Sequence, residues 1–213
     1  MLSRAHSRAF TLIELMIAMA IVGITLMAGL PLLKSWSQNM QVRASAEATL
    51  NGLQYARAEA LKRNTTVRFT LMTTADNNCA VSTGQTNWVV NLGTSLTNDP
   101  SSECGKTITP GITQNSSAAT YSPYLLKVYA ATGAGNVNVA STGTVGNMLV
   151  VFDQFGKVQY PTVDTQWVFS YPSAGACATS SADGVVCMNV LISTNGRMRM
   201  CNPILPSGSP QGC

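Results

Sequence analysis

The feature that most limits the fold of this chain is a long apolar segment near its N-terminus. Residues 10–33 contain one charged residue, Glu14, and nineteen uncharged residues separate it from Lys34. A helix of this length and hydropathy is long enough to cross a bilayer. Arg4 and Arg8 precede the segment, so the preference for positive charge inside places the residues after Lys34 outside the cytoplasm. The sequence therefore predicts a transmembrane helix over residues 10–33.

A cleavable secretory signal or a plain membrane anchor explains this segment less well. The apolar region of a signal peptide has about 7–15 residues and ends in small residues at a cleavage site. Here the apolar region covers 24 positions and contains a carboxylate. Within a membrane that carboxylate costs about 2.5–3.5 kcal/mol, and a plain anchor gives no reason for it. Glu14 therefore requires a partner at membrane depth.

The residues around Glu14 resemble a known processing signal. A short basic leader, residues 1–9, ends at Ala9, and residues 10–14 read Phe-Thr-Leu-Ile-Glu. This pattern resembles the class III leader of type IV pilins and type II secretion pseudopilins. The resemblance implies that a prepilin peptidase cuts before Phe10 and methylates the new amine, and that Glu14 pairs with the N-terminal amine of a neighbouring subunit during assembly. Ala9 departs from the family, in which glycine is usual at this position.

A helical pattern continues beyond the apolar segment. Apolar residues recur at spacings of three and four, and charged residues fall between them. We expect residues 34–64 to extend the helix, which ends at Asn64 after a basic last turn. We also expect the charged residues to form a solvated face rather than a binding site. The apolar positions are Val42, Ala46, Leu50, Leu53, Ala56 and Ala60, and the charged ones are Arg43, Glu47, Arg57, Lys62 and Arg63.

From residue 65 onward the period changes to two, which is typical of strands. We expect residues 65–213 to form an extracytoplasmic antiparallel β domain, so that the chain has an α+β fold with its long N-terminal helix packed on a C-terminal sheet domain. Residues 73–123 and 132–146 are polar and are expected to be loops, the first with one or two short strands. The strand candidates are residues 66–72, 87–92, 125–130, 148–152, 157–160, 166–171, 185–192 and 197–201.

Two of the predicted strand pairs surround a turn that contains glycine. Residues 148–158 include Gly156, and residues 190–201 include the pair Asn195-Gly196, which favours a hairpin. Together with residues 56–64, these segments resemble the GspH/FimT branch of the pilin superfamily. The resemblance implies the pilin fold, and it implies the membrane, the prepilin peptidase and other pilins as partners.

The six cysteines all lie on the side predicted to be exported, where an even number favours disulfides. Six cysteines allow fifteen pairings. We expect the sequential one, Cys79–Cys104, Cys177–Cys187 and Cys201–Cys213, because each pair brackets a loop or tail with little apolar material. The sequence has no CxxC, and its one histidine, His6, lies in the leader. We therefore expect neither a metal site nor a cofactor.

No catalytic constellation stands out. A chain without residues 1–9 has no histidine, and no glycine-rich phosphate loop lies between a strand and a helix. Asp153, Asp164 and Asp183 lie near turns, where aspartate usually caps the backbone. Without Arg4 and Arg8 the net charge falls from +4 to +2, which excludes nucleic-acid binding by bulk charge alone. We expect a structural protein rather than an enzyme.

One candidate binding motif is Gly196-Arg197-Met198-Arg199. If residues 197–201 form a strand, the two guanidiniums share a face about 6.8 Å apart and the methionine faces the other way. No acidic residue follows Gly184, so the local field is positive. In the FimT branch a GRxR motif is associated with binding double-stranded DNA in natural transformation, so the resemblance implies this role for Gly196, Arg197 and Arg199. The alternative is an ordinary hairpin with solvated arginines; the sequence does not place Lys106, Lys127 or Lys157 relative to it.

These observations favour a minor pilin of a type IV pilus, which helps assembly and contacts DNA. The alternative is a pseudopilin of a type II secretion system, and a third possibility, an anchored module that never polymerises, gives no role to Glu14. We expect a single-pass inner-membrane precursor with a periplasmic C-terminal domain, which then enters a pilus or pseudopilus.

Overall fold

The structure is a computed structural model that describes residues 11–95, 97–108, 121–122, 124–133, 135–142, 148–180 and 184–213. The chain divides into two compact units, Met1–Ser37 and Gln38–Cys213. The predicted processing residues Ala9 and Phe10 lie outside the described residues.

The first unit is the N-terminal part of helix α1, which runs from Leu12 to Arg63. The helix begins after Thr11, whose hydroxyl accepts a hydrogen bond of 3.3 Å from the backbone N–H of Glu14 and so caps the first turn. No helix in the described part of the chain is long and apolar enough to cross a membrane. The span predicted over residues 10–33 stays a prediction. The large apolar side chains that are exposed here are Leu12, Ile13, Leu15, Met16, Ile17, Met19, Ile21, Val22, Ile24, Leu26 and Met27.

In the second unit, α1 buries the apolar stripe that its sequence predicts. Val42, Ala46, Leu53, Ala56 and Ala60 are inaccessible to solvent, and Leu50 packs against the same cluster. The helix ends as expected at Asn64, which adopts a left-handed conformation with φ 51°. Such a residue lets the chain turn back, and the N–H of Thr65 donates to the carbonyl of Ala60 at 3.3 Å.

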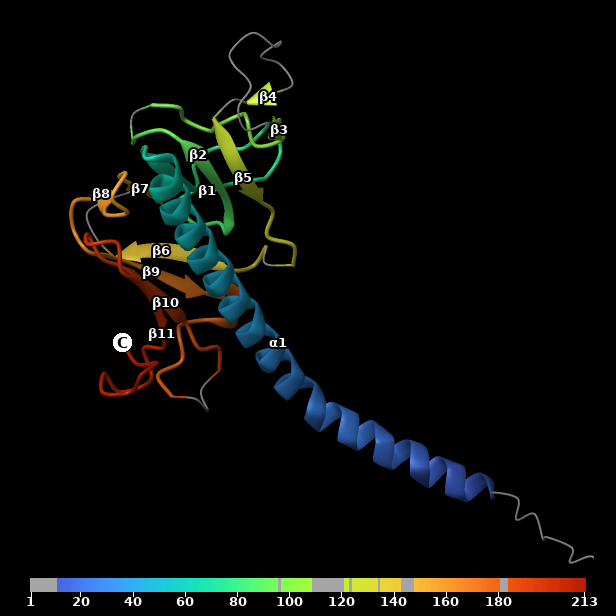
Figure 1. The fold of residues 1–213 in the computed structure, drawn as a ribbon. Helices are drawn as coiled ribbons and strands as arrows, with labels where there is room; N and C mark the ends of the chain where they lie inside the picture. The colour runs from blue at the N-terminus through green and yellow to red at the C-terminus, as the bar shows by residue number, and fades with distance from the viewer. Residues whose placement is uncertain are drawn as a thin grey trace, which may run out of the picture. The chain divides into compact units, whose positions relative to one another are not determined.

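Two antiparallel sheets form the rest of the second unit (Figure 1). In the five-stranded sheet the order is β5 (Leu125–Tyr129), β2 (Asn87–Leu92), β1 (Val67–Met72), β7 (Leu149–Phe152) and β8 (Val158–Tyr160). In the four-stranded sheet it is β11 (Met198–Cys201), β10 (Met188–Ile192), β9 (Thr165–Ser170) and β6 (Asn138–Thr142). The short strands β3 (Thr107–Ile108) and β4 (Tyr121–Ser122) pair in parallel, and a 3-10 turn covers Pro172–Ala174.

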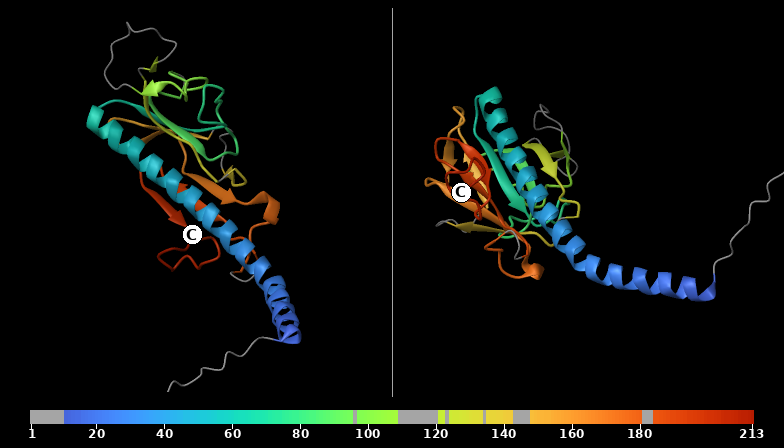
Figure 2. Two further views of the ribbon diagram at one scale, coloured as in Figure 1. Left: turned by 90° about the vertical axis from the view of Figure 1, so that its right-hand side faces the viewer. Right: turned by 90° about the horizontal axis from the view of Figure 1, so that it is seen from below.

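Both sheets pack on α1 and share one hydrophobic core (Figure 2). The ring of Phe69 from the five-stranded sheet lies 5.9 Å from that of Trp167 in the four-stranded sheet, and 5.5 Å from that of Trp88. A Cβ atom on Gly52 would lie 2.7 Å from Phe69. Glycine at this helix position therefore lets α1 approach the aromatic rings closely. The observed architecture confirms the predicted α+β fold.

One predicted loop is wrong. Residues 132–146 are polar and were expected to lack strands, but β6 lies within them and pairs with β9. Its residues read Asn-Val-Ala-Ser-Thr, and Val139 is the one that the core buries. Because β6 is an edge strand with a solvated outer face, it needs a single apolar side chain, and its composition resembles that of a loop.

Candidate functional site

Two turns of the second unit have the same backbone hydrogen bonds. They are residues 153–157, which join β7 to β8, and residues 193–197, which join β10 to β11. The N–H groups of Asp153 and Ser193 donate to the carbonyls of Lys157 and Arg197, which are the last residues of the two turns, at 2.9 Å. The N–H groups of Gly156 and Gly196 donate back to the carbonyls of Asp153 and Ser193, at 2.9 and 2.8 Å. Lys157 and Arg197 therefore hold equivalent positions, and both are exposed.

The two turns also contact each other. The N–H of Val158 donates to the carbonyl of Thr194 at 3.0 Å. A Cβ atom on Gly196 would lie 2.1 Å from the carbonyl oxygen of Gly156, and Gly196 has φ 82°. The space and the left-handed backbone both require glycine at this position.

Helix α1 holds both turns through Arg57. Its Nε donates to the carbonyl of Gly156 at 3.0 Å and lies 3.3 Å from the position of a Cβ atom on Gly196. The expectation that Arg57 belongs to a solvated face is wrong, because the turn covers its side chain. Arg43 does behave as expected: it is exposed and pairs with Glu47 at 2.9 Å.

The aspartates near these turns bind backbone, as the sequence suggests. One oxygen of Asp153 accepts from the N–H groups of Phe155 and Lys157, at 2.9 and 2.8 Å. Asp164, from the segment before β9, accepts from the N–H and hydroxyl of Thr194, at 2.8 and 3.2 Å. Both carboxylates therefore fix the turns. The third aspartate, Asp183, lies outside the described residues.

The two candidate arginines lie on the side of the hairpin that faces away from the core. Arg197 and Arg199 are exposed, whereas Met198 and Met200 are half-buried and pack against the core. Arg197 lies in the turn just before β11. A depression of about 470 Å³ is lined by Leu191, Ser193, Asn195, Arg197, Met198 and Arg199. The structure thus brings both arginines to the lining of one hollow.

The C-terminal tail lies along the outer edge of β11. The N–H of Asn202 donates to the carbonyl of Gln211 at 2.7 Å, and Nη1 of Arg199 donates to the carbonyl of Gly212 at 3.1 Å. A disulfide between Cys201 and Cys213 closes the tail. The tail therefore restrains Arg199, while the side chain of Arg197 lies outside it in the neighbouring turn.

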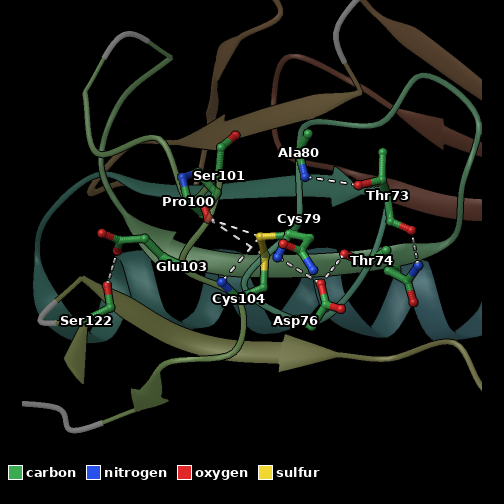
Figure 3. Close-up of a disulfide and its surroundings, with 12 residues drawn as sticks. Thr73, Thr74, Asp76, Cys79, Ala80, Pro100, Ser101, Glu103, Cys104 and Ser122 are labelled. Carbon is green, nitrogen blue, oxygen red and sulfur yellow. Dashed lines mark hydrogen bonds between the residues drawn. A yellow bond between two sulfur atoms is a disulfide. The ribbon is translucent and has the colours of Figure 1, made fainter. Parts of the chain in front are cut away.

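The structure has three disulfides, and they are the three that the sequence predicts: Cys79–Cys104, Cys177–Cys187 and Cys201–Cys213. Both sulfurs of the first are buried under the polar segment after β1 (Figure 3). Asp76 turns this segment by accepting from Thr74 and from the N–H of Asn78, at 2.7 and 2.9 Å. These hydrogen bonds lower the pKa of Asp76. The bond thus holds a loop of little apolar content on the outer face of the five-stranded sheet.

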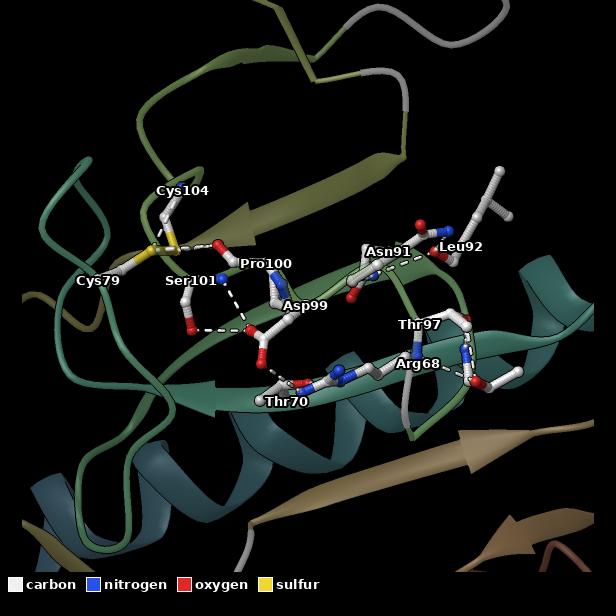
Figure 4. A network of polar contacts seen from close by, with 12 residues as sticks. Arg68, Thr70, Cys79, Asn91, Leu92, Thr97, Asp99, Pro100, Ser101 and Cys104 are labelled. Carbon is white, nitrogen blue, oxygen red and sulfur yellow. Dashed lines mark hydrogen bonds and ion pairs between the residues drawn. A yellow bond between two sulfur atoms is a disulfide. The ribbon is translucent and has the colours of Figure 1, made fainter.

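A buried arginine lies beside the segment after β2, which the same disulfide joins to the segment after β1 (Figure 4). Arg68 is 2% exposed; its Nε donates to Thr70 at 2.8 Å, and its Nη2 lies 3.8 Å from a carboxylate oxygen of Asp99. Burial lowers the pKa of Arg68, against the effect of Asp99. Burial raises the pKa of Asp99, but two hydrogen bonds from Ser101 and the charge of Arg68 outweigh this and leave it below its ordinary value. We assign this network to fixing the loop.

The remaining lysines have other partners. Lys106 pairs with Glu103 at 3.1 Å, and Nζ of Lys127 lies 4.9 Å from the centre of the Tyr55 ring. Of the lysines considered for the arginine surface, Lys157 is therefore the one that the structure places beside it. Among the described residues, no group of three His, Cys, Asp or Glu side chains is placed to hold a metal ion.

From the sequence, Arg57 was assigned to a solvated face and Lys157 was considered for the arginine surface but could not be placed. Arg57 gave no signal, because its partner lies 99 residues away. A signal for Lys157 was present: both turns place a basic residue directly after their glycine, and a comparison of the two would have found it.

A long N-terminal helix with exposed apolar residues in its first part, and antiparallel sheets packed on its second part, defines the class of pilin-like subunits. Comparison with known families agrees. Residues 4–30 match the prokaryotic N-terminal methylation motif, and residues 45–211 match the family described as type II transport protein GspH. The chain belongs to this GspH family.

Solved structures similar to this chain include two crystal forms of the type IV minor pilin FimU from Pseudomonas aeruginosa. The first shares 17% identity with a TM-score of 0.47, covering 84% of this chain and 98% of FimU. The second shares 17% identity with a TM-score of 0.44, and the match covers 80% of this chain and 98% of FimU. No curated protein matches the chain.

Membership of this family makes the chain a minor pilin-like or pseudopilin-like subunit of the type IV pilus or type II secretion families. Such proteins are structural subunits rather than enzymes. Membership also implies assembly with other pilins and processing by prepilin peptidase.

Proposed function

We propose that this protein is a minor pilin of a type IV pilus and that it contacts DNA through Arg197 and Arg199. The observation that carries the proposal is the position of two exposed arginines, Arg197 and Arg199, which both line one hollow on the outer side of the β10–β11 hairpin. Guanidinium groups are suited to phosphate because they present several donors in one plane. Gly196 has a structural part in the motif, because it lets the two turns meet.

The charges around the arginines support an anionic ligand. Lys157 holds the equivalent position in the neighbouring turn and is exposed. The nearby carboxylates, Asp153 and Asp164, accept hydrogen bonds from the turn backbones. Two arginines that neutralise two phosphates give a salt slope of about −1.8, which is weak binding for one subunit.

The proposal includes the route to the filament. The precursor is anchored in the inner membrane by residues 10–33 with its second unit in the periplasm, prepilin peptidase cuts between Ala9 and Phe10, and the Glu14 carboxylate then pairs with the amine of a neighbouring subunit. The match to the N-terminal methylation motif and the apolar, exposed side chains of residues 12–27 support this route.

A pseudopilin of a type II secretion system is the second candidate. The observation that favours it is the family match over residues 45–211, because the matched family is described as a type II transport protein. In that case the arginines are solvated surface and the subunit contributes to a periplasmic fibre.

DNA binding separates the two candidates. We would purify the full chain in detergent micelles and measure fluorescence anisotropy with labelled duplex DNA across a salt series. We expect Arg197→Ala/Arg199→Ala to abolish binding or to reduce the salt slope by about 1.8. The control is Lys34→Ala/Arg43→Ala, which removes the same charge from exposed positions of α1.

Equal affinity in the two double variants, or no binding by the intact chain at low salt, contradicts the DNA contact. Either result favours the pseudopilin.

A further inference from the structure

Phe155 is an aromatic side chain that belongs to neither hydrophobic cluster of the described residues. It lies in the turn between β7 and β8 and is 69% exposed, more than any other large apolar side chain in the described part of residues 38–213. Exposure of one apolar side chain is common, so its surroundings decide whether it has a function.

The turn that carries Phe155 is held from both sides. The N–H of Phe155 donates to the carboxylate of Asp153 at 2.9 Å, and the carbonyl of the next residue, Gly156, accepts from Arg57 of α1 at 3.0 Å. The backbone that presents the ring is therefore fixed before any ligand binds. A ring on a fixed backbone loses less conformational freedom on binding than one on a mobile loop.

Basic side chains lie on both sides of this turn. Lys157 is the last residue of the turn, and Arg197 holds the equivalent position in the neighbouring turn, which contacts it at Gly156 and Gly196. Leu61 of α1 lies 3.3 Å from the position of a Cβ atom on Gly156, and the next residue, Lys62, has a side chain that is 73% exposed.

Three carboxylates belong to the same region and are already engaged. Glu59 pairs with Arg63 and Lys62, at 2.6 and 3.6 Å. Asp153 and Asp164 accept hydrogen bonds from the turns. The cations Arg57, Lys62, Arg63, Lys157, Arg197 and Arg199 outnumber these three, so the last turns of α1, the two turns and the start of β11 together carry net positive charge.

We propose that Phe155 stacks on an unpaired base of a DNA strand whose phosphates contact Lys157 and Arg197. An aromatic ring beside cations is the arrangement by which proteins bind single-stranded nucleic acid, because every base has a face that can stack. In an intact duplex those faces are covered by neighbouring bases. This inference rests on the proposed DNA contact and adds a preference for strands with unpaired bases.

An acidic protein partner fits the same surface less well. A stable protein interface buries about 800 Å² on each partner. The exposed large apolar side chains that the structure describes in this region are Phe155, Leu61 and Val163. Three separate side chains are enough for one base but few for a protein interface.

The test compares single-stranded and duplex DNA of one sequence, with the full chain in detergent micelles. We expect Phe155→Ala to weaken single-strand binding by about fivefold to a hundredfold, the range for loss of one stacked base, and to leave duplex binding unchanged.

Phe155→Trp is expected to retain the affinity and to show quenched tryptophan fluorescence with the single strand. The control Met40→Ala removes a side chain of α1 that is 50% exposed and lies 17 residues from Arg57.

Each other outcome overturns the inference in a recognisable way. If Phe155→Ala binds the single strand as well as the native chain does, Phe155 does not stack on a base. The proposed DNA contact still stands in that case, provided that Arg197→Ala/Arg199→Ala loses duplex binding. Equal losses for both DNAs contradict the preference for unpaired bases, and an equal loss in Met40→Ala means that the effect is not specific to Phe155. Loss of co-assembly with other pilins at unchanged DNA affinity assigns the ring to a protein partner. Absence of any DNA binding by the intact chain removes both proposals.

Discussion

At the residue scale, Gly196 is a position where both the backbone conformation and the surrounding atoms exclude a side chain. It has φ 82°, and a Cβ atom there would lie 2.1 Å from the carbonyl oxygen of Gly156. We expect Gly196→Ala to lower the free energy of unfolding by about 2 kcal/mol or more, because it adds backbone strain to a steric clash. Thermal melting of the full chain in detergent measures this. Gly208→Ala is the control, since its Cβ meets nothing within 4 Å, and equal melting of the two variants contradicts the argument.

The role of Arg57 is explained by its contact with the turn between β7 and β8, which lies far from it in the sequence. Removing its guanidinium leaves the carbonyl of Gly156 without the donor at 3.0 Å. We expect Arg57→Ala to reduce the free energy of unfolding by about 1.5–3 kcal/mol, as for a hydrogen bond to a charged group. Arg43→Ala on the same helix removes an exposed pair and is expected to cost about 0.3–0.5 kcal/mol. Denaturant unfolding of both variants compares them, and similar losses would show that the turn does not depend on Arg57.

At the scale of elements, the last turn of α1 depends on pH. A hydrogen bond from Arg63 lowers the pKa of Glu59, which is 7% exposed and lies 2.6 Å from that arginine. A carboxyl whose pKa falls on folding stabilises the folded state above its unfolded pKa, about 4.3, and this stability is lost as the pH falls through the folded value.

We therefore expect Glu59→Gln to be less stable than the native chain at neutral pH, with a difference that shrinks below about pH 4. Denaturant unfolding at a series of pH values measures it. Glu47→Gln, which changes an exposed carboxylate of the same helix, is the control. A constant difference across the series would mean that Glu59 acts by packing rather than by charge.

The disulfides can be tested element by element, because trypsin separates the three pairs. Cleavage after each lysine and arginine leaves Cys79 and Cys104 in residues 69–106, and the second pair in residues 158–197. The third pair lies in residues 200–213. We expect a non-reducing digest to show three separate peptides, each lighter by two hydrogen atoms than its reduced form. Any cross-link between these peptides contradicts the sequential pairing.

At the scale of the whole molecule, we expect assembly to depend on the N-terminus. If the Glu14 carboxylate is neutralised by the amine of a neighbouring subunit, Glu14→Ala should insert into the membrane normally but fail to enter filaments. Fractionation of membranes and sheared filaments measures both. Glu47→Ala is the control, since this carboxylate is exposed and already has a partner in Arg43. Normal incorporation of Glu14→Ala contradicts the pairing.

The same scale includes processing. We expect mass spectrometry of the mature protein to find Phe10 at the N-terminus, with a methylated amine. An N-terminus at Met1, or a cut near Ala28, would contradict the predicted cleavage.

The helix and most strands were predictable because their signals are local. The apolar positions of α1 recur with the helix period, and all the predicted strands are present with small differences at their ends. The strand β6 was not predictable, because an edge strand with one buried side chain has the composition of a loop. Periodicity also cannot show that Arg68 is buried. Arg68 alternates with core residues of β1, so its side chain lies on the other face of the sheet. It is buried because the loop closed by Cys79 and Cys104 covers that other face.

The sequence by itself determined the class of this protein. The apolar segment with Glu14, the amphipathic extension, the period-two strands and the paired cysteines are all short-range patterns, and each specifies its element without reference to the rest of the chain. Only the tertiary structure decided the surface that we propose for DNA. Arg57, Gly156 and Gly196 are far apart in sequence, and they meet because α1 and both sheets close over one core. That packing, rather than any motif, brings the turn that contains Phe155 and Lys157 against the turn that contains Arg197.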